Sequence, residues 1–164
     1  DSNGKAKAAG YIDDSGNGAG NDADDDRPTI TDITEPTVDE GQAAVFDVTL
    51  SNVSELATPI TMSLTDGNAE SGSDYNGTTV SVTYLEYDAQ SDSMVSVSRP
   101  VTVDNGEFHF ELPAGNTSFS VSVTTLNESG QPVYEGDETF TLTAATEAQV
   151  EANASQSGSA TIQD

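Results

Sequence analysis

The sequence predicts an all-β protein, an antiparallel two-sheet sandwich of the immunoglobulin type. Apolar and polar residues alternate in many short segments, turn-forming residues separate these segments, and no convincing amphipathic helix is present. Alternation with a period of two places the apolar side chains on one face of a strand. About seven to nine such strands in residues 29–164 fit this type of sandwich.

The alternation starts near Thr29 and continues to the C-terminus. Val, Thr, Phe and Tyr, which suit half-buried strands, are frequent in these segments. The predicted inward faces are, in chain order, Phe46, Val48 and Leu50; Ile60, Met62 and Leu64; Val80, Val82 and Tyr84; Phe108, Phe110 and Leu112; Phe119, Val121 and Val123; and Phe140, Leu142 and Ala144.

Two connecting segments carry signals of their own. Asn105-Gly106, within VDNGEF (103–108), predicts a hairpin with a type I′ turn, because both residues tolerate a positive φ. The segment ATEAQVEANA (145–154) is weakly helix-permissive, and we interpret it as a long loop or a poor strand around Val150.

The charge of the chain excludes several partners. There are 29 acidic and four basic residues among 164, a net charge of −25. Nucleic acids and anionic membrane surfaces require clustered Lys and Arg, so small cations are the natural counterpart of this chain. No apolar run of about 18 residues is present, which argues against insertion into a membrane.

The sequence also argues against an enzyme. It has no Cys and one His, which excludes disulfides and thiolate sites and disfavours a zinc site. His109 alternates with Phe108 and Phe110, so we expect it on a solvent-facing strand surface without a nucleophile beside it.

The two ends of the sequence match each other weakly. Ala160 to Asp164 (ATIQD) and Gly10 to Asp14 (GYIDD) share the pattern small–x–Ile–x–Asp, at an offset of 150 residues. This match predicts a tandem array. Residues 1–14 would be the terminal strand of a preceding repeat, or an overhang from it, and residues 15–28 an Asp- and Gly-rich linker to the sandwich at 29–164.

Four segments together resemble the Calx-β family, especially the immunoglobulin-like variants repeated in giant bacterial RTX-type adhesins. They are TVDEGQAAVFDVTLS, SGSDYNG, YEGDETFTLT and the terminal ATIQD, and the resemblance covers residues 28–164. The chain departs from the family in carrying Asn127-Glu128, followed by a short insertion, where an acidic pair is usual. Residues 85–101 are also longer than the family pattern and are expected to form an additional hairpin.

The resemblance implies calcium bound at one pole of the sandwich. The positions that match the family's ligands are Glu40, Asp74, Glu135, Asp137, Glu138 and Asp164. Each lies at a predicted strand end or in a loop, so carboxylates far apart in sequence can converge on an ion that takes about six to eight oxygens. The alternative is that these acidic residues only solvate the loops of an acidic protein.

The acidic residues of the linker are also interpreted as cation ligands. We predict that its aspartates, Asp13, Asp14, Asp24, Asp25 and Asp26, bind cations shared with the neighbouring pole and fix the junction between repeats. The segment lacks the Gly and Glu of an EF-hand loop. Plain solvated disorder is the alternative, because a Gly- and Asp-rich linker is flexible and self-repelling.

These observations lead to a functional hypothesis. We expect a non-enzymatic, calcium-stabilised extender repeat of a secreted adhesin on a bacterial cell surface, with roles in cell adhesion and biofilms. Its partners would be neighbouring repeats of the same chain, and the isolated domain would be monomeric. The rival hypothesis is a ligand-binding module, for a saccharide or a peptide, that uses the hairpin at 85–101.

Overall fold

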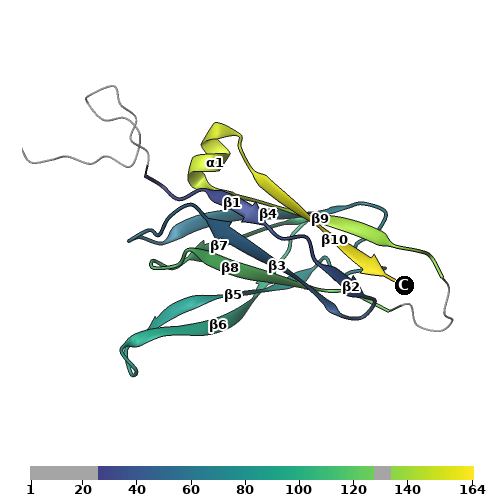
Figure 1. The fold of residues 1–164 in the computed structure, drawn as a ribbon, viewed down its shortest axis with the longest axis horizontal. Coiled ribbons are helices and arrows are strands. Elements are labelled where there is room, and N and C mark those ends of the chain that lie inside the picture. Colours follow the sequence, from purple (N-terminus) through teal and green to yellow (C-terminus); the bar gives the residue numbers. More distant parts are fainter. Residues whose placement is uncertain (1–25, 128–133) are drawn as a thin grey trace, which may run out of the picture.

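The computed structural model describes residues 26–127 and 134–164, and within them ten strands form two five-stranded sheets (Figure 1). One sheet has the order β1 (Ile30–Ile33), β3 (Ala43–Leu50), β8 (Ser118–Thr124), β5 (Thr79–Asp88) and β6 (Ser93–Thr102). The other has the order β2 (Thr37–Asp39), β10 (Gln156–Gln163), β9 (Glu138–Thr146), β4 (Thr58–Asp66) and β7 (Glu107–Leu112). Every pairing is antiparallel except the parallel pairing of β2 with β10. The predicted all-β sandwich is confirmed.

The predicted inward faces form the core between the two sheets. All are buried except Tyr84 and Phe110, which are half-buried beside the open edge strands. Phe140 lies at the centre, with its ring edge-on to Phe46 at 5.9 Å and stacked on Tyr75 at 4.2 Å. Burial of these large rings is the dominant stabilising contribution of such a core.

The interpretation of residues 145–154 as a loop or poor strand was wrong, because they contain the helix α1 (Glu147–Ala152). The helix is held by the buried side chain of Gln149. Its Nε2 donates to the carbonyl of Ile30 at 2.9 Å, and its Oε1 accepts from the N–H groups of Ile30 at 2.7 Å and Thr146 at 3.1 Å. Asn153, with a φ of 54°, ends the helix in the left-handed conformation. In the described part of the chain, no helix has the length and apolar character needed to cross a membrane.

The predicted turn at Asn105-Gly106 is present, but the predicted hairpin is not. Both residues have positive φ, 53° and 84°, as a type I′ turn requires. However, the turn joins β6 of one sheet to β7 of the other, and the pairing across it is limited to Asp104 and Glu107. The turn instead packs against β4, where the N–H of Leu64 donates to the Gly106 carbonyl at 2.8 Å.

The additional hairpin is confirmed and is longer than predicted. β5 and β6 pair along all ten of their residues, from Thr79–Thr102 to Asp88–Ser93, and the hairpin projects beyond the body of the sandwich (Figure 1). β5 pairs with β8 only through residues 81–83. The rest of the hairpin, called here the arm (residues 84–98), therefore relies on other contacts.

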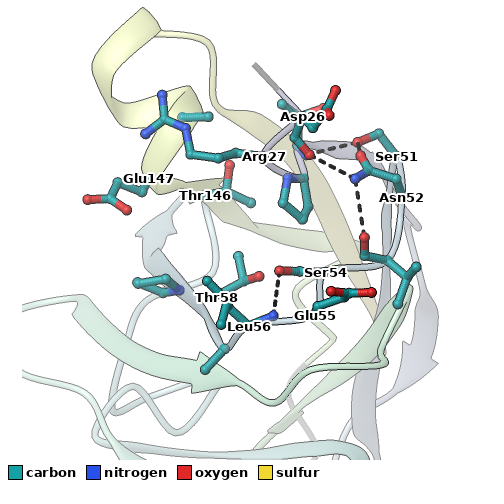
Figure 2. Close-up of a pocket in the computed structure, with 16 residues that line it drawn as sticks. Asp26, Arg27, Ser51, Asn52, Ser54, Glu55, Leu56, Thr58, Thr146 and Glu147 are labelled. Carbon is teal, nitrogen blue, oxygen red and sulfur yellow. Dashed lines mark hydrogen bonds between the residues drawn. The ribbon is translucent and has the colours of Figure 1, made fainter. Parts of the chain in front are cut away.

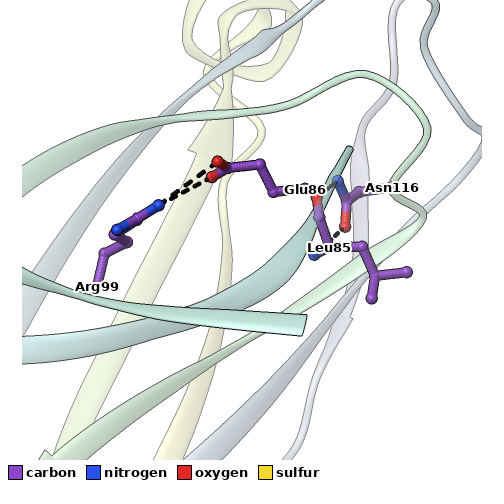
Figure 3. A network of polar contacts seen from close by, with 4 residues as sticks. All are labelled: Leu85, Glu86, Arg99 and Asn116. Carbon is purple, nitrogen blue, oxygen red and sulfur yellow. Dashed lines mark hydrogen bonds and ion pairs between the residues drawn. The ribbon is translucent and has the colours of Figure 1, made fainter. Parts of the chain in front are cut away.

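One side chain extends the sheet toward the arm. Asn116 lies in the β7–β8 connection and its amide pairs with both backbone groups of Leu85, accepting from the N–H at 2.9 Å and donating to the carbonyl at 2.8 Å. Figure 3 shows Asn116 beside Leu85, together with the exposed ion pair of Arg99 and Glu86 at 3.3 Å. Asn116 thus acts as a short continuation of β8.

We expect Asn116→Ala to destabilise the domain by about 1–3 kcal/mol, because Leu85 would lose its partners in a site where Asn116 is 3% exposed. Urea denaturation measures this loss. Ser96→Ala is the control, since Ser96 faces Leu85 from β6 but is exposed, and should change stability by less than about 0.5 kcal/mol. Equal effects of the two substitutions would contradict the role given to Asn116.

Candidate metal site

Several acidic residues lie in segments at the end of the sandwich where the described chain reaches Asp164, marked C in Figure 1. Glu40 follows β2, Asp74 lies between β4 and β5, Glu135 precedes β9, Glu138 begins β9, and Asp164 follows β10. Carboxylate oxygens of Asp74, Glu135 and Glu138 all lie within 4.8 Å of one another. These three residues are called here the acidic cluster.

The loop that carries Asp74 is fixed to the core. Tyr75 is buried against Phe140, and its hydroxyl donates to Asp66 at the end of β4. Burial, followed by this hydrogen bond, raises the pKa of Tyr75, so the hydroxyl remains a donor. One oxygen of Asp74 accepts from the N–H of Glu70 at 2.7 Å. The position of Asp74 therefore follows from the packing of its neighbour Tyr75.

Asn68 and Asp164 hold the segment that carries the two glutamates. The side chain of Asn68 accepts from the N–H of Thr139 at 2.8 Å and donates to the carbonyl of Asp137 at 3.2 Å. Asp164 accepts from the N–H of Glu135 at 2.5 Å. The start of β9 is thus connected both to the Asp74 loop and to the C-terminal residue.

The pKa of Glu138 is affected by the carboxylates that surround it. Its pKa is raised first by burial and then by the negative charges of Asp74, Glu135, Glu40 and Asp164. Glu138 and these four residues are five of the six ligand positions that the family resemblance implies. Crowded carboxylates repel one another, and a shared cation relieves that repulsion.

The arginines of the described residues make ion pairs elsewhere. Arg27 pairs with Glu151 at 2.8 Å and Arg99 pairs with Glu86 at 3.3 Å, on α1 and the β5–β6 hairpin respectively. The donors of the cluster are carboxylate oxygens, which are the ligands that Ca²⁺ prefers. Two oxygens on one Ca²⁺, each at roughly 2.3–2.6 Å, can be up to about 5 Å apart. The spacing in the cluster fits such an ion.

The other predicted ligands lie in different places. Asp137 is exposed, and it is not among the described residues whose carboxylate oxygens lie within 4.8 Å of one another; only its backbone carbonyl is held, by Asn68. Asp26 lies at the opposite end, where its carbonyl accepts from the side chain of Asn52 at 2.9 Å. The remaining linker positions fall outside the described residues: Asp13, Asp14, Asp24 and Asp25.

Several residues of the site were not predicted. Asp66 and Asn68 lie upstream of the SGSDY motif (residues 71–75) and belong to no motif of their own. Asn127 lies over the turn that carries Glu40, since a Cβ on Gly41 would be 2.7 Å from the Asn127 side-chain oxygen. The departure from the family at Asn127 therefore places a neutral amide beside this turn. Only the contacts of the folded chain reveal these roles.

The raised pKa of Glu138 gives a pH prediction for the metal-free protein. A carboxyl whose pKa is raised by folding stabilises the fold while it is protonated. For Glu138 this contribution is lost as the pH rises from 4.5, the ordinary pKa of the carboxyl, through the raised pKa of the folded state. In chelator at neutral pH, Glu138→Gln should therefore melt at a higher temperature than wild type. This advantage should shrink as the pH falls toward 4.5, and a difference that is constant with pH would contradict the prediction.

Comparison with solved structures identifies the fold. The chain matches the crystal structure of CBD12 from CALX1.2 with a TM-score of 0.51 and 14% identity, over 84% of this chain and 45% of that one. Weaker matches are the apo-form Calx CBD1 domain (TM-score 0.49, 13% identity, 84% of this chain and 97% of that one) and ACE19, the collagen binding subdomain of Enterococcus faecalis surface protein ACE (0.41, 10%, 82% and 96%). No family model and no curated protein matches the sequence.

The match to CBD12 shows that the chain has the immunoglobulin-like fold of Calx-β domains, as the sequence motifs predicted. The chain spans less than half of the length of that structure. At this level of identity the likeness concerns the fold alone, so the assignment of a ligand rests on the geometry of the acidic cluster.

Proposed function

We propose that this chain is a calcium-stabilised extender repeat of a secreted, RTX-type adhesin on a bacterial cell surface, where it serves adhesion and biofilm formation without enzymatic activity. The observation that supports this most directly is the acidic cluster of Asp74, Glu135 and Glu138 beside the C-terminal residue. The described chain begins at the opposite end, beside α1 (Figure 1). Copies in series would therefore have a calcium site at every junction.

The residues of the cluster would hold the ion, with Glu40 and Asp164 adding negative charge beside it. Bound Ca²⁺ would supply two positive charges to carboxylates from two separate parts of the sandwich, the β4–β5 loop and the segment that leads into β9. The ion would then join the Asp74 loop to the start of β9, and the hydrogen bond from Glu135 to Asp164 connects this segment to the chain end. This would restrict the motion of the end from which the next repeat continues.

The linker determines whether calcium also fixes the junction. About 16 flexible residues have a root-mean-square span of about 20–24 Å and allow a broad range of angles between repeats. Aspartates that bind cations at the junction would narrow that range. A rigid series of repeats would hold a distal ligand-binding region away from the cell.

Small-angle scattering of a two-copy protein joined by DDSGNGAGNDADDDRP tests this proposal. Calcium should give a narrower and more rod-like distance distribution than chelator does. Replacing Asp24, Asp25 and Asp26 with Ser should abolish the narrowing and leave the melting of each domain nearly unchanged. A wild-type distribution that is the same in calcium and in chelator would show that the linker is only a tether.

A second candidate function is supported by the arm. Leu85, Tyr87 and Met94 are exposed there, and Tyr87 and Met94 pair across the two strands. These apolar side chains would suit a saccharide or peptide ligand, as the rival hypothesis requires. A glycan-array screen in calcium, with Tyr87→Ser as the comparison, separates the two functions, since an extender repeat binds no glycan and is unaffected by this substitution.

A further inference from the structure

A pocket of about 1080 Å³, drawn in Figure 2, lies beside α1, at the end of the sandwich opposite the acidic cluster (Figure 1). Three segments line it: residues 26–29 at the start of the described chain, residues 51–59 from the β3–β4 connection into the start of β4, and residues 146–148 where β9 passes into α1. Two apolar side chains of its lining are exposed to solvent, Val53 at 52% and Leu56 at 71%. Exposed apolar side chains beside a hollow are characteristic of surfaces that bind a partner.

The opposite end presents one large exposed side chain. Tyr134 is 84% exposed, the highest fraction among the exposed large apolar residues of the described chain. It directly precedes Glu135 of the acidic cluster, whose N–H is bonded to Asp164. Tyrosine is enriched at the centres of protein interfaces because it combines a large apolar ring with a polar tip.

We propose that Tyr134 of one copy docks into the pocket of the copy that follows it in the chain. This inference rests on the tandem arrangement proposed above and names the contact between neighbouring repeats. The contact is heterologous, because the two copies use different surfaces. Such contacts continue from copy to copy without closing into a ring when the copies are arranged in series.

The path of the chain brings the two surfaces together. Residues 26–29 form one wall of the pocket, and the repeat match places Asp14 where Asp164 of the preceding copy would be. Asp14 and Asp26 are twelve positions apart in the sequence. A flexible segment of this length spans about 17–21 Å and at most about 40 Å. The preceding Tyr134 is thereby kept at an effective concentration of about a millimolar, so a weak contact is sufficient.

The charges of the two surfaces make this contact dependent on calcium. The pocket lining includes Asp26, Glu55 and Glu147 against Arg27, which pairs with Glu151. The cluster beside Tyr134 is acidic too, so two ends without calcium repel each other. A divalent cation in the cluster lowers the negative charge next to the neutral phenol of Tyr134 and permits close approach.

The test places the same substitution in either copy of a two-copy protein in calcium. Tyr134→Ala in the first copy removes the docking side chain and should broaden the small-angle scattering distance distribution. In the second copy it should have no effect, because no pocket follows. Leu56→Ser should show the reverse, with an effect in the second copy and none in the first.

The positional controls also separate this inference from the proposed function. Each substitution has the same cost to its own domain wherever it is placed, and thermal melting in calcium verifies that cost. If calcium stabilises the domains but the position of Tyr134→Ala makes no difference, the docking contact is wrong and the calcium function stands. If calcium does not raise the melting temperature, the proposed function fails, and the docking contact that rests on it fails too.

Discussion

Removal of calcium with a chelator should lower the melting temperature of this domain by about 5–11 °C. An ion that binds only the folded state adds about 2.7 kcal/mol when its free concentration is 100 times the dissociation constant. For a chain of this size, each kcal/mol changes the melting temperature by about 2–4 °C. The site acts on stability because its carboxylates come from separate connections that converge only in the folded chain.

Differential scanning calorimetry in matched buffers of equal ionic strength measures this shift. Magnesium is the control, because Mg²⁺ is smaller, loses its water reluctantly and is rarely held by a set of protein carboxylates alone. It should stabilise the domain less than calcium does. Identical melting temperatures in calcium and in chelator would contradict the presence of a calcium site.

Asp74→Ala and Glu138→Ala should each weaken calcium binding by about 10- to 150-fold. Each substitution removes one charged oxygen donor, and an interaction with a charged group contributes about 1.5–3 kcal/mol. Both residues belong to the acidic cluster, and the carboxylate of Asp74 already has a fixed orientation through the N–H of Glu70. Isothermal titration calorimetry measures the two affinities directly.

Glu107→Ala is the matched control for these substitutions. Glu107 is exposed on β7 and is not part of the cluster. Its replacement by Ala removes the same charge from the protein as the other two substitutions do. Its substitution should leave the affinity within about twofold of wild type, which corresponds to about 0.4 kcal/mol. If all three substitutions weaken binding equally, the net charge of the chain, and not a defined site, attracts the ion.

The strand faces could be predicted from the sequence because alternation is a local signal. Phe46, Val48 and Leu50 are buried in β3 as their spacing indicated. The helix α1 could not be predicted in the same way, since six residues are too few to show a helical period. It depends on Gln149, which contacts the backbone of Ile30 at a separation of 119 residues. Such a contact is invisible in any short window of sequence.

For the candidate site, too, the sequence predicted some residues from local motifs and missed those that depend on tertiary contacts. The motifs SGSDY and YEGDE predicted Asp74, Glu135 and Glu138, which the structure places together. The residues that hold them are found only through tertiary contacts. Asn68 bonds to Thr139 across 71 positions, and that contact requires β4 and β9 to pair in their observed register. A motif can therefore indicate ligands without indicating their supports.

The parallel pairing of β2 with β10 determines how the domain responds to tension along the chain. Thr37, Val38 and Asp39 pair with residues 161–163, and the N–H of Glu40 continues the ladder to the Gln163 carbonyl at 3.1 Å. A pull that separates the two chain ends slides these parallel strands past each other, so their hydrogen bonds are loaded in shear and must fail together. Glu40 lies at the end of this ladder, beside the acidic cluster. An ion bound there would stabilise the end of this strand pairing, and calcium would then raise the force at which the domain unfolds.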